Sequence, residues 1–160
     1  TYAATKRFEE GEQIANELLE SSSKPREESA DYLFLVAMLD RARGNHEKAV
    51  TALEKAMSAA RRRYHRVYMG ALAETYTLMG DRDNAIAWYR KAIESEKHSS
   101  PHMIQFHYRL GLLCEEQKDF HAAGEAYRCF LGFWQDADPD IPILADAGSR
   151  LGALEAQAIS

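Results

Sequence analysis

An internal repeat constrains the fold of this chain more than any other feature. Segment 44–50, GNHEKAV, recurs as segment 80–86, GDRDNAI, at an offset of 36 residues. A looser third copy, 118–123 (KDFHAA), lies 38 residues after the second, with lysine in place of the glycine. Repeats with a period of about 20 to 50 residues are typical of solenoids, propellers and related arrays. We therefore expect one supersecondary unit, repeated along the chain.

Each copy reads as the turn between two antiparallel helices. Gly80 suits the left-handed conformation that ends a helix, and Asp81 or Asp83 can cap the next helix through a side-chain oxygen. Apolar residues three and four apart flank the turn, as expected for amphipathic helices. Small alanines among them allow close helix contact, and Tyr76 and Tyr89 fill the gaps. The flanking apolar residues are Leu72, Ala73, Tyr76 and Met79 before the turn, and Ala85, Trp88, Tyr89, Ala92 and Ile93 after it.

These residues resemble the tetratricopeptide repeat family, whose unit is a helix-turn-helix of about 34 residues with small and aromatic residues at fixed places. The units depart from the family pattern at Asp40, Cys114 and Phe130, so they are degenerate repeats. The matching residues are Val36, Ala37, Gly44, Ala49 and Ala56 in the first unit, Leu72, Ala73, Tyr76, Gly80, Ala85 and Ala92 in the second, and Leu110, Gly111, Ala123 and Tyr127 in the third.

The resemblance implies an all-α fold of about eight helices, stacked as antiparallel pairs into an α-α superhelix. At 160 residues, the chain fits a single domain of this kind. We expect an N-terminal helix in 1–29, for which half of a truncated repeat is one interpretation, followed by three repeats and a capping helix. The repeats are 30–63, 66–99 and 104–135, and the capping helix is 138–160. The start at Thr1, without methionine, suggests a segment of a longer protein.

Segment 130–142, FLGFWQDADPDIP, is similar to the closing stretch of the repeat regions in large bacterial multidomain regulators, including kinase and transcription-regulator types. This narrower resemblance implies a sensor or docking portion of a signalling protein.

Composition and charge limit the classes of partner and the cellular location that we expect. The net charge of −5 and the pI of 5.7 disfavour nucleic acid, because phosphate binding needs clustered, uncompensated Lys and Arg. No apolar run is long enough to span a bilayer, and no basic region followed by a hydrophobic block marks an export signal. Cys114 and Cys129 form no disulfide framework or C-x-x-C pair. We expect a cytoplasmic protein.

Several residues resemble parts of a metal site, and each group has a simpler structural explanation. His98, His102 and His107 lie near one turn, but their spacing points them to different helix faces, so we expect no metal site. The acids in 136–140 mimic a calcium loop without its glycine and glutamate, and helix capping explains them. No phosphate loop, nucleophile elbow or H-E-x-x-H motif is present, so we expect neither an enzyme nor a cofactor.

The basic run 61–66, RRRYHR, contains the sole cluster of cations in the sequence. Its arginines can complement the C-terminal dipole of the preceding helix and lie in solvent, and an acidic partner is the alternative. Both cysteines are expected to be buried small hydrophobes rather than nucleophiles.

If the family alignment holds, the first helix of each pair lines a concave groove that binds a peptide or protein segment. The best-known family site grips an acidic C-terminal tail of a chaperone, but at its places this chain carries Phe34, Met38, Ala71, Gln105 and Arg109, of which Arg109 alone fits. We therefore expect such tails to bind poorly. The predicted groove residues are Phe34, Met38, Arg41, Glu74, Thr77, Gln105, Tyr108, Leu112 and Glu115.

The sequence thus predicts a protein-interaction scaffold, interpreted as a regulatory region of a larger protein, with a protein or peptide partner and neither nucleic acid nor membrane. The alternative is a homo-oligomerisation module, for example a homodimer, that pairs through exposed ends of the stack. Phe8, Ile14 and Leu18 would supply apolar contacts at the N-terminal end.

Overall fold

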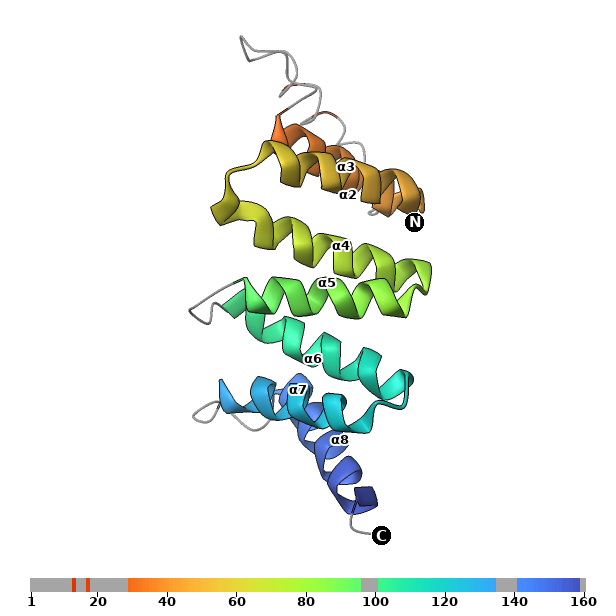
Figure 1. Ribbon diagram of the computed structural model, residues 1–160, viewed down its shortest axis with the longest axis vertical. Helices are drawn as coiled ribbons and strands as arrows, with labels where there is room; N and C mark the ends of the chain where they lie inside the picture. The colour runs from red at the N-terminus through yellow and green to blue at the C-terminus, as the bar shows by residue number, and fades with distance from the viewer. Residues whose placement is uncertain (1–12, 14–16, 18–28, 96–100, 135–140, 159–160) are drawn as a thin grey trace. The chain divides into compact units, whose positions relative to one another are not determined.

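The computed structural model describes residues 13, 17, 29–95, 101–134 and 141–158, and within them the secondary structure is entirely helical (Figure 1). The chain divides into two compact units, 1–81 and 82–160. The first unit contains α2 (Ala30–Ala42), α3 (His46–Ala59), the short 3-10 helix η2 (Arg62–Tyr64) and α4 (His65–Met79). The second contains α5 (Arg82–Glu94), α6 (Pro101–Glu116), α7 (Phe120–Gly132) and α8 (Pro142–Ala158).

These bounds fit the all-α prediction of about eight helices: the described residues hold seven α-helices. The last helix begins at Pro142, later than the expected 138, with proline in the first turn where its missing N–H costs nothing. Most of the expected N-terminal helix lies outside the described residues, together with Phe8, Ile14, Leu18, His98 and the acids of 136–140. Gln13 and Glu17 are helical, and the Gln13 amide donates to Glu17 at 2.8 Å.

The three repeated turns share one backbone geometry, as the sequence repeat predicts. Gly80 has φ 74°, its N–H donates to the Thr77 carbonyl at 3.1 Å, and the following N–H of Asp81 donates to Tyr76 at 3.0 Å. The same two hydrogen bonds close the turns at Gly44 (φ 81°) and Lys118 (φ 62°). Lysine therefore adopts the left-handed conformation where the other copies have glycine, a conformation that is unfavourable for a residue with a β-carbon.

Capping of the following helices varies between the copies. Asp119 caps α7, because its Oδ1 accepts a hydrogen bond from the Ala122 N–H at 3.1 Å. Asn45 makes no such bond before α3, and its amide donates instead to Asp40 at 3.3 Å. Asp83 lies inside the first turn of α5, where a carboxylate suits the positive end of the helix dipole.

In the first unit, α3 packs between α2 and α4. The interface depends on small side chains, which let the helices approach closely. The hydroxyl of Thr75, the buried polar side chain of this core, is satisfied by donating to the Ala71 carbonyl at 2.7 Å. The buried apolar residues of the unit are Ala37, Ala49, Ala52, Leu53, Ala56, Tyr68, Ala71, Leu72 and Ala73.

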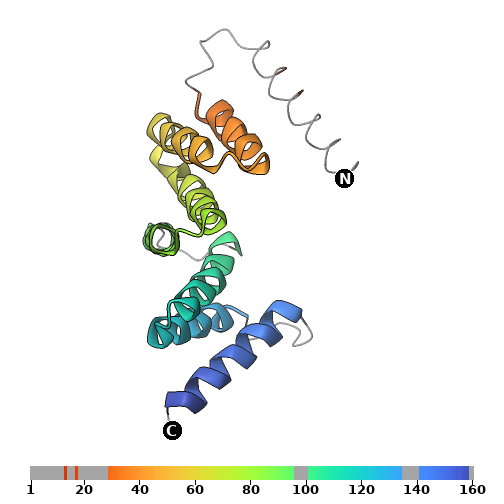
Figure 2. The ribbon, with the colours of Figure 1, turned by 90° about the vertical axis from the view of Figure 1, so that its right-hand side faces the viewer.

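In the second unit, α6 packs on α5 and α7, and α8 packs on α7 (Figure 2). Aromatic side chains fill this core: Tyr89 and Tyr127 are fully buried, and Phe130, where the family usually has alanine, is 1% exposed. Tyr89 also contacts Phe106, with ring centroids 5.5 Å apart. Because Gly111 has no side chain, the Tyr127 ring can pack directly against its backbone. Small and large positions interlock here as the sequence predicts.

Candidate functional site

The predicted groove residues of the first unit lie on α2 and α4. The Phe34 ring meets Tyr68 edge to face, with centroids 5.5 Å apart. Two turns further along α2, Arg41 Nη1 donates to Glu74 Oε2 at 2.8 Å. Because both contacts advance in the same direction along the two helices, α2 and α4 run parallel. Two of the predicted groove residues, Arg41 and Glu74, are thus brought together as an ion pair.

Met38 and Thr77 complete the predicted set of the first unit. Met38 lies one turn after Phe34 on α2 and is half-buried, whereas Thr77 on α4 is exposed. The Thr77 hydroxyl donates to the Ala73 carbonyl of its own helix at 2.8 Å. The α2–α4 face, defined by Phe34, Met38, Arg41, Glu74 and Thr77, therefore combines aromatic, thioether and charged groups.

In the second unit, α8 supplies polar partners to the predicted residues of α6. The Tyr108 hydroxyl donates to Asp146 Oδ2 at 2.6 Å. Arg150 donates from Nε to the same Asp146 oxygen at 2.7 Å and from Nη1 to Glu115 Oε2 at 3.1 Å. The Tyr127 hydroxyl of α7 donates to that Glu115 oxygen at 2.8 Å. One guanidinium thus links two carboxylates, and each carboxylate also accepts from a tyrosine.

This network shifts the pKa values of Asp146, Tyr108 and Tyr127. The pKa of Asp146 is lowered, first by the hydrogen bond from Tyr108 and then by that from Arg150. Burial raises the pKa of Tyr108, and its hydrogen bond to Asp146 raises it further. The pKa of Tyr127 is raised mainly by burial and then by Glu115. At neutral pH, Asp146 is therefore charged and the phenols of Tyr108 and Tyr127 are neutral.

Gln105 is exposed and Leu112 is half-buried on α6. The α6–α8 face, which we define by Gln105, Tyr108, Leu112 and Glu115 with their α8 partners Asp146 and Arg150, is therefore mixed in the same way as the α2–α4 face. Sequence reasoning missed Tyr68, Asp146 and Arg150, and it assigned Tyr127 to the repeat pattern but not to this network. The spacing of Asp146 and Arg150, four apart in the final helix, is the signal that could have suggested an ion pair there.

The basic run follows the end of α3. Arg61 and Arg62 are exposed, as expected for cations beyond a helix C-terminus. The His65 ring Nε2 lies 3.2 Å from the Ala60 carbonyl and so occupies an acceptor at the end of α3. Exposed Tyr64 adds an apolar surface beside the arginines.

The cysteines behave differently from each other. Cys114 is fully buried, and burial raises its thiol pKa, as predicted for a structural cysteine. The prediction for Cys129 is wrong: it lies on the exposed side of α7. Of the histidines near one turn, where the sequence predicts no metal site, His107 is half-buried, and burial lowers its pKa. In the described part of the chain, no three His, Cys, Asp or Glu side chains are grouped so that they could hold a metal ion.

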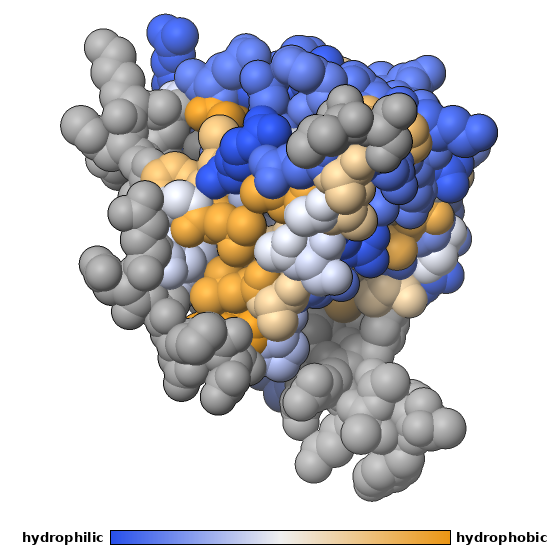
Figure 3. Space-filling view, turned by 90° about the horizontal axis from the view of Figure 1, so that it is seen from below, coloured by the Kyte–Doolittle hydropathy of each residue, from blue (hydrophilic) through white to orange (hydrophobic). Residues whose placement is uncertain are grey.

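Seen from below, the surface carries a band of apolar side chains bordered by hydrophilic ones (Figure 3). Exposed apolar patches can mark interaction sites, although single exposed apolar residues are ordinary. The large apolar residues that are most exposed are Tyr64, Val67, Leu78, Met79, Phe120, Phe133 and Trp134.

Across 29–95, 101–134 and 141–158, none of the helices has both the length and the apolar character that a membrane span requires.

Antiparallel helix pairs with repeated turns and parallel first helices define a helical-repeat protein. The tetratricopeptide repeat model matches residues 30–63, 68–98 and 104–128. The chain belongs to the tetratricopeptide repeat family, and such repeats generally mediate protein–protein interactions.

Solved structures show the same fold. BtubC (BKLC) from P. vanneervenii superimposes with a TM-score of 0.66 and 19% identity, over 99% of this chain and 65% of that one. The nearly identical TPR-like repeats of a putative kinesin light chain from Podosopora anserina give a TM-score of 0.68 and 14% identity, over 96% of this chain and 78% of that one. This chain therefore spans less than two thirds of BtubC. Comparison with curated proteins gives no significant match.

Proposed function

We propose that the chain is a protein-interaction scaffold that binds a segment of a partner protein along the faces formed by its first helices. In the first unit this is the α2–α4 face, and in the second it is the α6–α8 face. The observation that carries the proposal is that Phe34 and Arg41 join α2 to α4 through specific contacts, 5.5 Å between ring centroids and 2.8 Å between charged atoms. Such contacts fix the side chains that a partner would meet.

The chemistry of both faces suits a protein segment. Half-buried Phe34, Met38 and Leu112 can contact apolar anchors, and exposed Thr77 and Gln105 can donate or accept hydrogen bonds. Charged groups on these faces are already paired, so a partner meets an ordered surface and less side-chain entropy is lost on binding. A regulatory role within a larger protein rests on the same proposal.

Site-specific photo-crosslinking tests this function. A benzophenone amino acid is placed at Thr77 or at Gln105, because both side chains are exposed on the proposed faces. The matched control is Lys55, an exposed residue of α3. After irradiation in lysate of the source cell, the proposal expects one partner to crosslink at Thr77 and at Gln105 and not at Lys55. Crosslinking of that partner at Lys55 alone would move binding to the second helices.

Self-association is measured on the same samples by light scattering. A mass of one chain at micromolar concentration would leave both faces open to a partner. A mass of two chains, with crosslinks between copies at Thr77 or Gln105, would assign the faces to the homodimer instead.

A further inference from the structure

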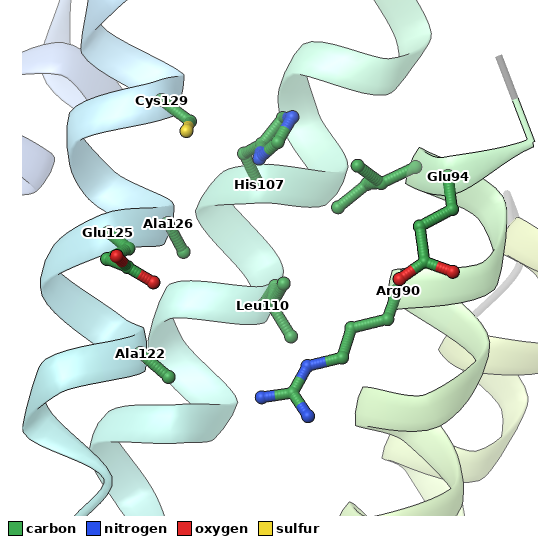
Figure 4. A pocket seen from close by; sticks show the side chains of 9 residues that line it. Arg90, Glu94, His107, Leu110, Ala122, Glu125, Ala126 and Cys129 are labelled. Atoms are coloured by element: carbon green, nitrogen blue, oxygen red, sulfur yellow. The ribbon is translucent and has the colours of Figure 1, made fainter.

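The second unit has a hollow on a different side from the α6–α8 face. Its walls are α5 and α7, with α6 between them (Figure 4). Arg90 and Glu94 come from α5, His107 from α6, and Glu125 and Cys129 from α7. The residues that line it are Arg90, Ile93, Glu94, His107, Leu110, Ala122, Glu125, Ala126 and Cys129.

Size limits what the hollow can hold. Its volume is about 180 Å³. Pockets for cofactors and drug-sized molecules usually measure about 300 to 1,000 Å³. The hollow therefore suits one long side chain of a partner rather than a cofactor. Ile93, Leu110 and Ala126 supply apolar surface for the stem of such a side chain.

Charge selects among long side chains. Glu94 and Glu125 extend from opposite walls (Figure 4) and are both exposed. Among the described residues, the ion-pair partner of Glu125 is the exposed ring of His121 at 3.9 Å, a weak contact that exists only when the ring is protonated. Arg90 is the one arginine or lysine of the lining, and its guanidinium forms a hydrogen bond with the Cys114 thiol, which opposes the rise in the thiol pKa caused by burial. The two carboxylates thus outnumber the lining cation, and half-buried His107 adds no charge at neutral pH.

We propose that this hollow binds a lysine or arginine side chain of a partner protein, with the aliphatic stem on Ile93, Leu110 and Ala126 and the cationic head between Glu94 and Glu125. Long cationic side chains bury their methylene groups on apolar surface and keep the charged end in contact with polar groups. The site is separate from the first-helix faces, so it gives the chain a second point of contact with a basic segment.

A titration followed by methyl and amide NMR tests this site on the full 160-residue chain. The probes are the Nα-acetyl N-methylamides of arginine, lysine, norleucine and glutamate, which share a backbone and differ in the end group. Arginine and lysine are expected to shift the Ala122, Ala126 and Leu110 methyl signals and saturate at millimolar concentration. Norleucine should bind about fivefold more weakly, because it lacks the charge that one exposed ion pair rewards.

Two variants separate the contributions. Glu94→Gln with Glu125→Gln removes the carboxylates and should bring arginine down to the affinity of norleucine. Ala122→Leu fills the hollow and should abolish the shifts for every probe, with unchanged helical circular dichroism as the check on folding. Glu54→Gln, an exposed carboxylate of α3, is the matched control and should leave arginine binding unchanged.

Three results would overturn the assignment. Equal affinity for arginine and norleucine would remove the role of the carboxylates. Preference for glutamate would show that Arg90 decides the charge of the hollow. Absence of methyl shifts with any probe at tens of millimolar would show that the hollow takes no side chain, and none of these results depends on the first-helix faces.

Discussion

Gly111 of α6 faces the ring of Tyr127 of α7 so closely that an added β-carbon would lie 2.5 Å from Tyr127 Cε1. The ring cannot turn away freely, because Tyr127 is fully buried and its hydroxyl donates to Glu115. Glycine at this position therefore sets how closely α6 and α7 approach.

Gly111→Ala should destabilise the protein by about 1 to 3 kcal/mol, the usual cost of an extra methyl group in a packed core. Gly152→Ala is the matched control, because it is also a helical glycine but its added β-carbon meets nothing within 4 Å. That variant should stabilise by about 0.5 to 1 kcal/mol through helix propensity. Urea unfolding followed by circular dichroism measures both. Equal effects of the two substitutions would contradict the close contact at Gly111.

Lys118→Gly should stabilise the protein, because lysine occupies the left-handed region at φ 62°. The gain is about 0.5 to 1 kcal/mol, since relief of a cost of about 1 to 2 kcal/mol is offset in part by the greater entropy of glycine in the unfolded chain. Gly80→Ala is the reciprocal control and should destabilise, although its added β-carbon meets no atom within 4 Å. A loss of stability in Lys118→Gly, measured by urea unfolding, would show that the lysine side chain contributes more than its conformation costs.

Asp146 should stabilise the fold at neutral pH and lose that effect in acid. Its pKa in the folded state is lowered from 3.8. The stabilisation is therefore present above pH 3.8 and disappears as the pH falls through the lower folded pKa. The urea midpoints of the protein and of Asp146→Asn should differ at pH 6, and the difference should shrink as the pH falls below 3.8. A constant difference between them across this range would place the effect of Asp146 in packing rather than charge.

Arg150→Gln should destabilise by about 1 kcal/mol at neutral pH, in the range of partly exposed ion pairs, because Asp146 and Glu115 lose their shared cation. Arg82→Gln is the matched control, because it also removes an ion-paired arginine. Arg82 pairs with a single carboxylate, that of Glu116, and the side chains of both partners are more than half exposed. Its effect on urea unfolding should be smaller. A larger loss of stability in Arg82→Gln than in Arg150→Gln would show that the hydrogen bonds of Arg150 to Asp146 and Glu115 contribute less to stability than the exposed pair.

The two thiols should react at very different rates with a disulfide reagent such as DTNB. Exposed Cys129 should react at once, whereas Cys114, which is fully buried and has a raised pKa, should react only when the second unit opens. Cys129→Ser should remove the fast phase and Cys114→Ser the slow one. Two fast phases in the native protein would show that Cys114 is accessible without unfolding.

Peptides that end in acidic residues with a free carboxylate should bind with a Kd weaker than about 10 μM, which corresponds to roughly 7 kcal/mol. At the matching places, Met38 is half-buried and Ala71 is 8% exposed within the core. Neither side chain has an N–H or O–H group that could donate a hydrogen bond to a carboxylate. Isothermal titration calorimetry measures the affinity, and a peptide with an amidated C-terminus is the control. Tighter binding that requires the free carboxylate would contradict this prediction.

Much of the local structure was predictable because its causes lie within a few residues. Gly44 and Gly80 mark the left-handed turns, and the spacing of apolar residues around them marks the helix faces. The third turn was recognisable at Lys118 only through its neighbours, since lysine gives no local reason for a positive φ. Cys129 shows the limit of periodicity, because it lies near an apolar stripe of α7 yet remains exposed.

The sequence by itself determined the helix pairs, their turns and the alternation of small and large residues, because hydrogen bonds and side-chain spacing within one turn decide these features. Only the tertiary structure decided which polar groups meet. Arg41 reaches Glu74, and Arg150 reaches Glu115, across 33 and 35 residues of sequence. Such pairs depend on the relative shift of two packed helices, which is fixed by the shapes of many core side chains together and not by any local pattern.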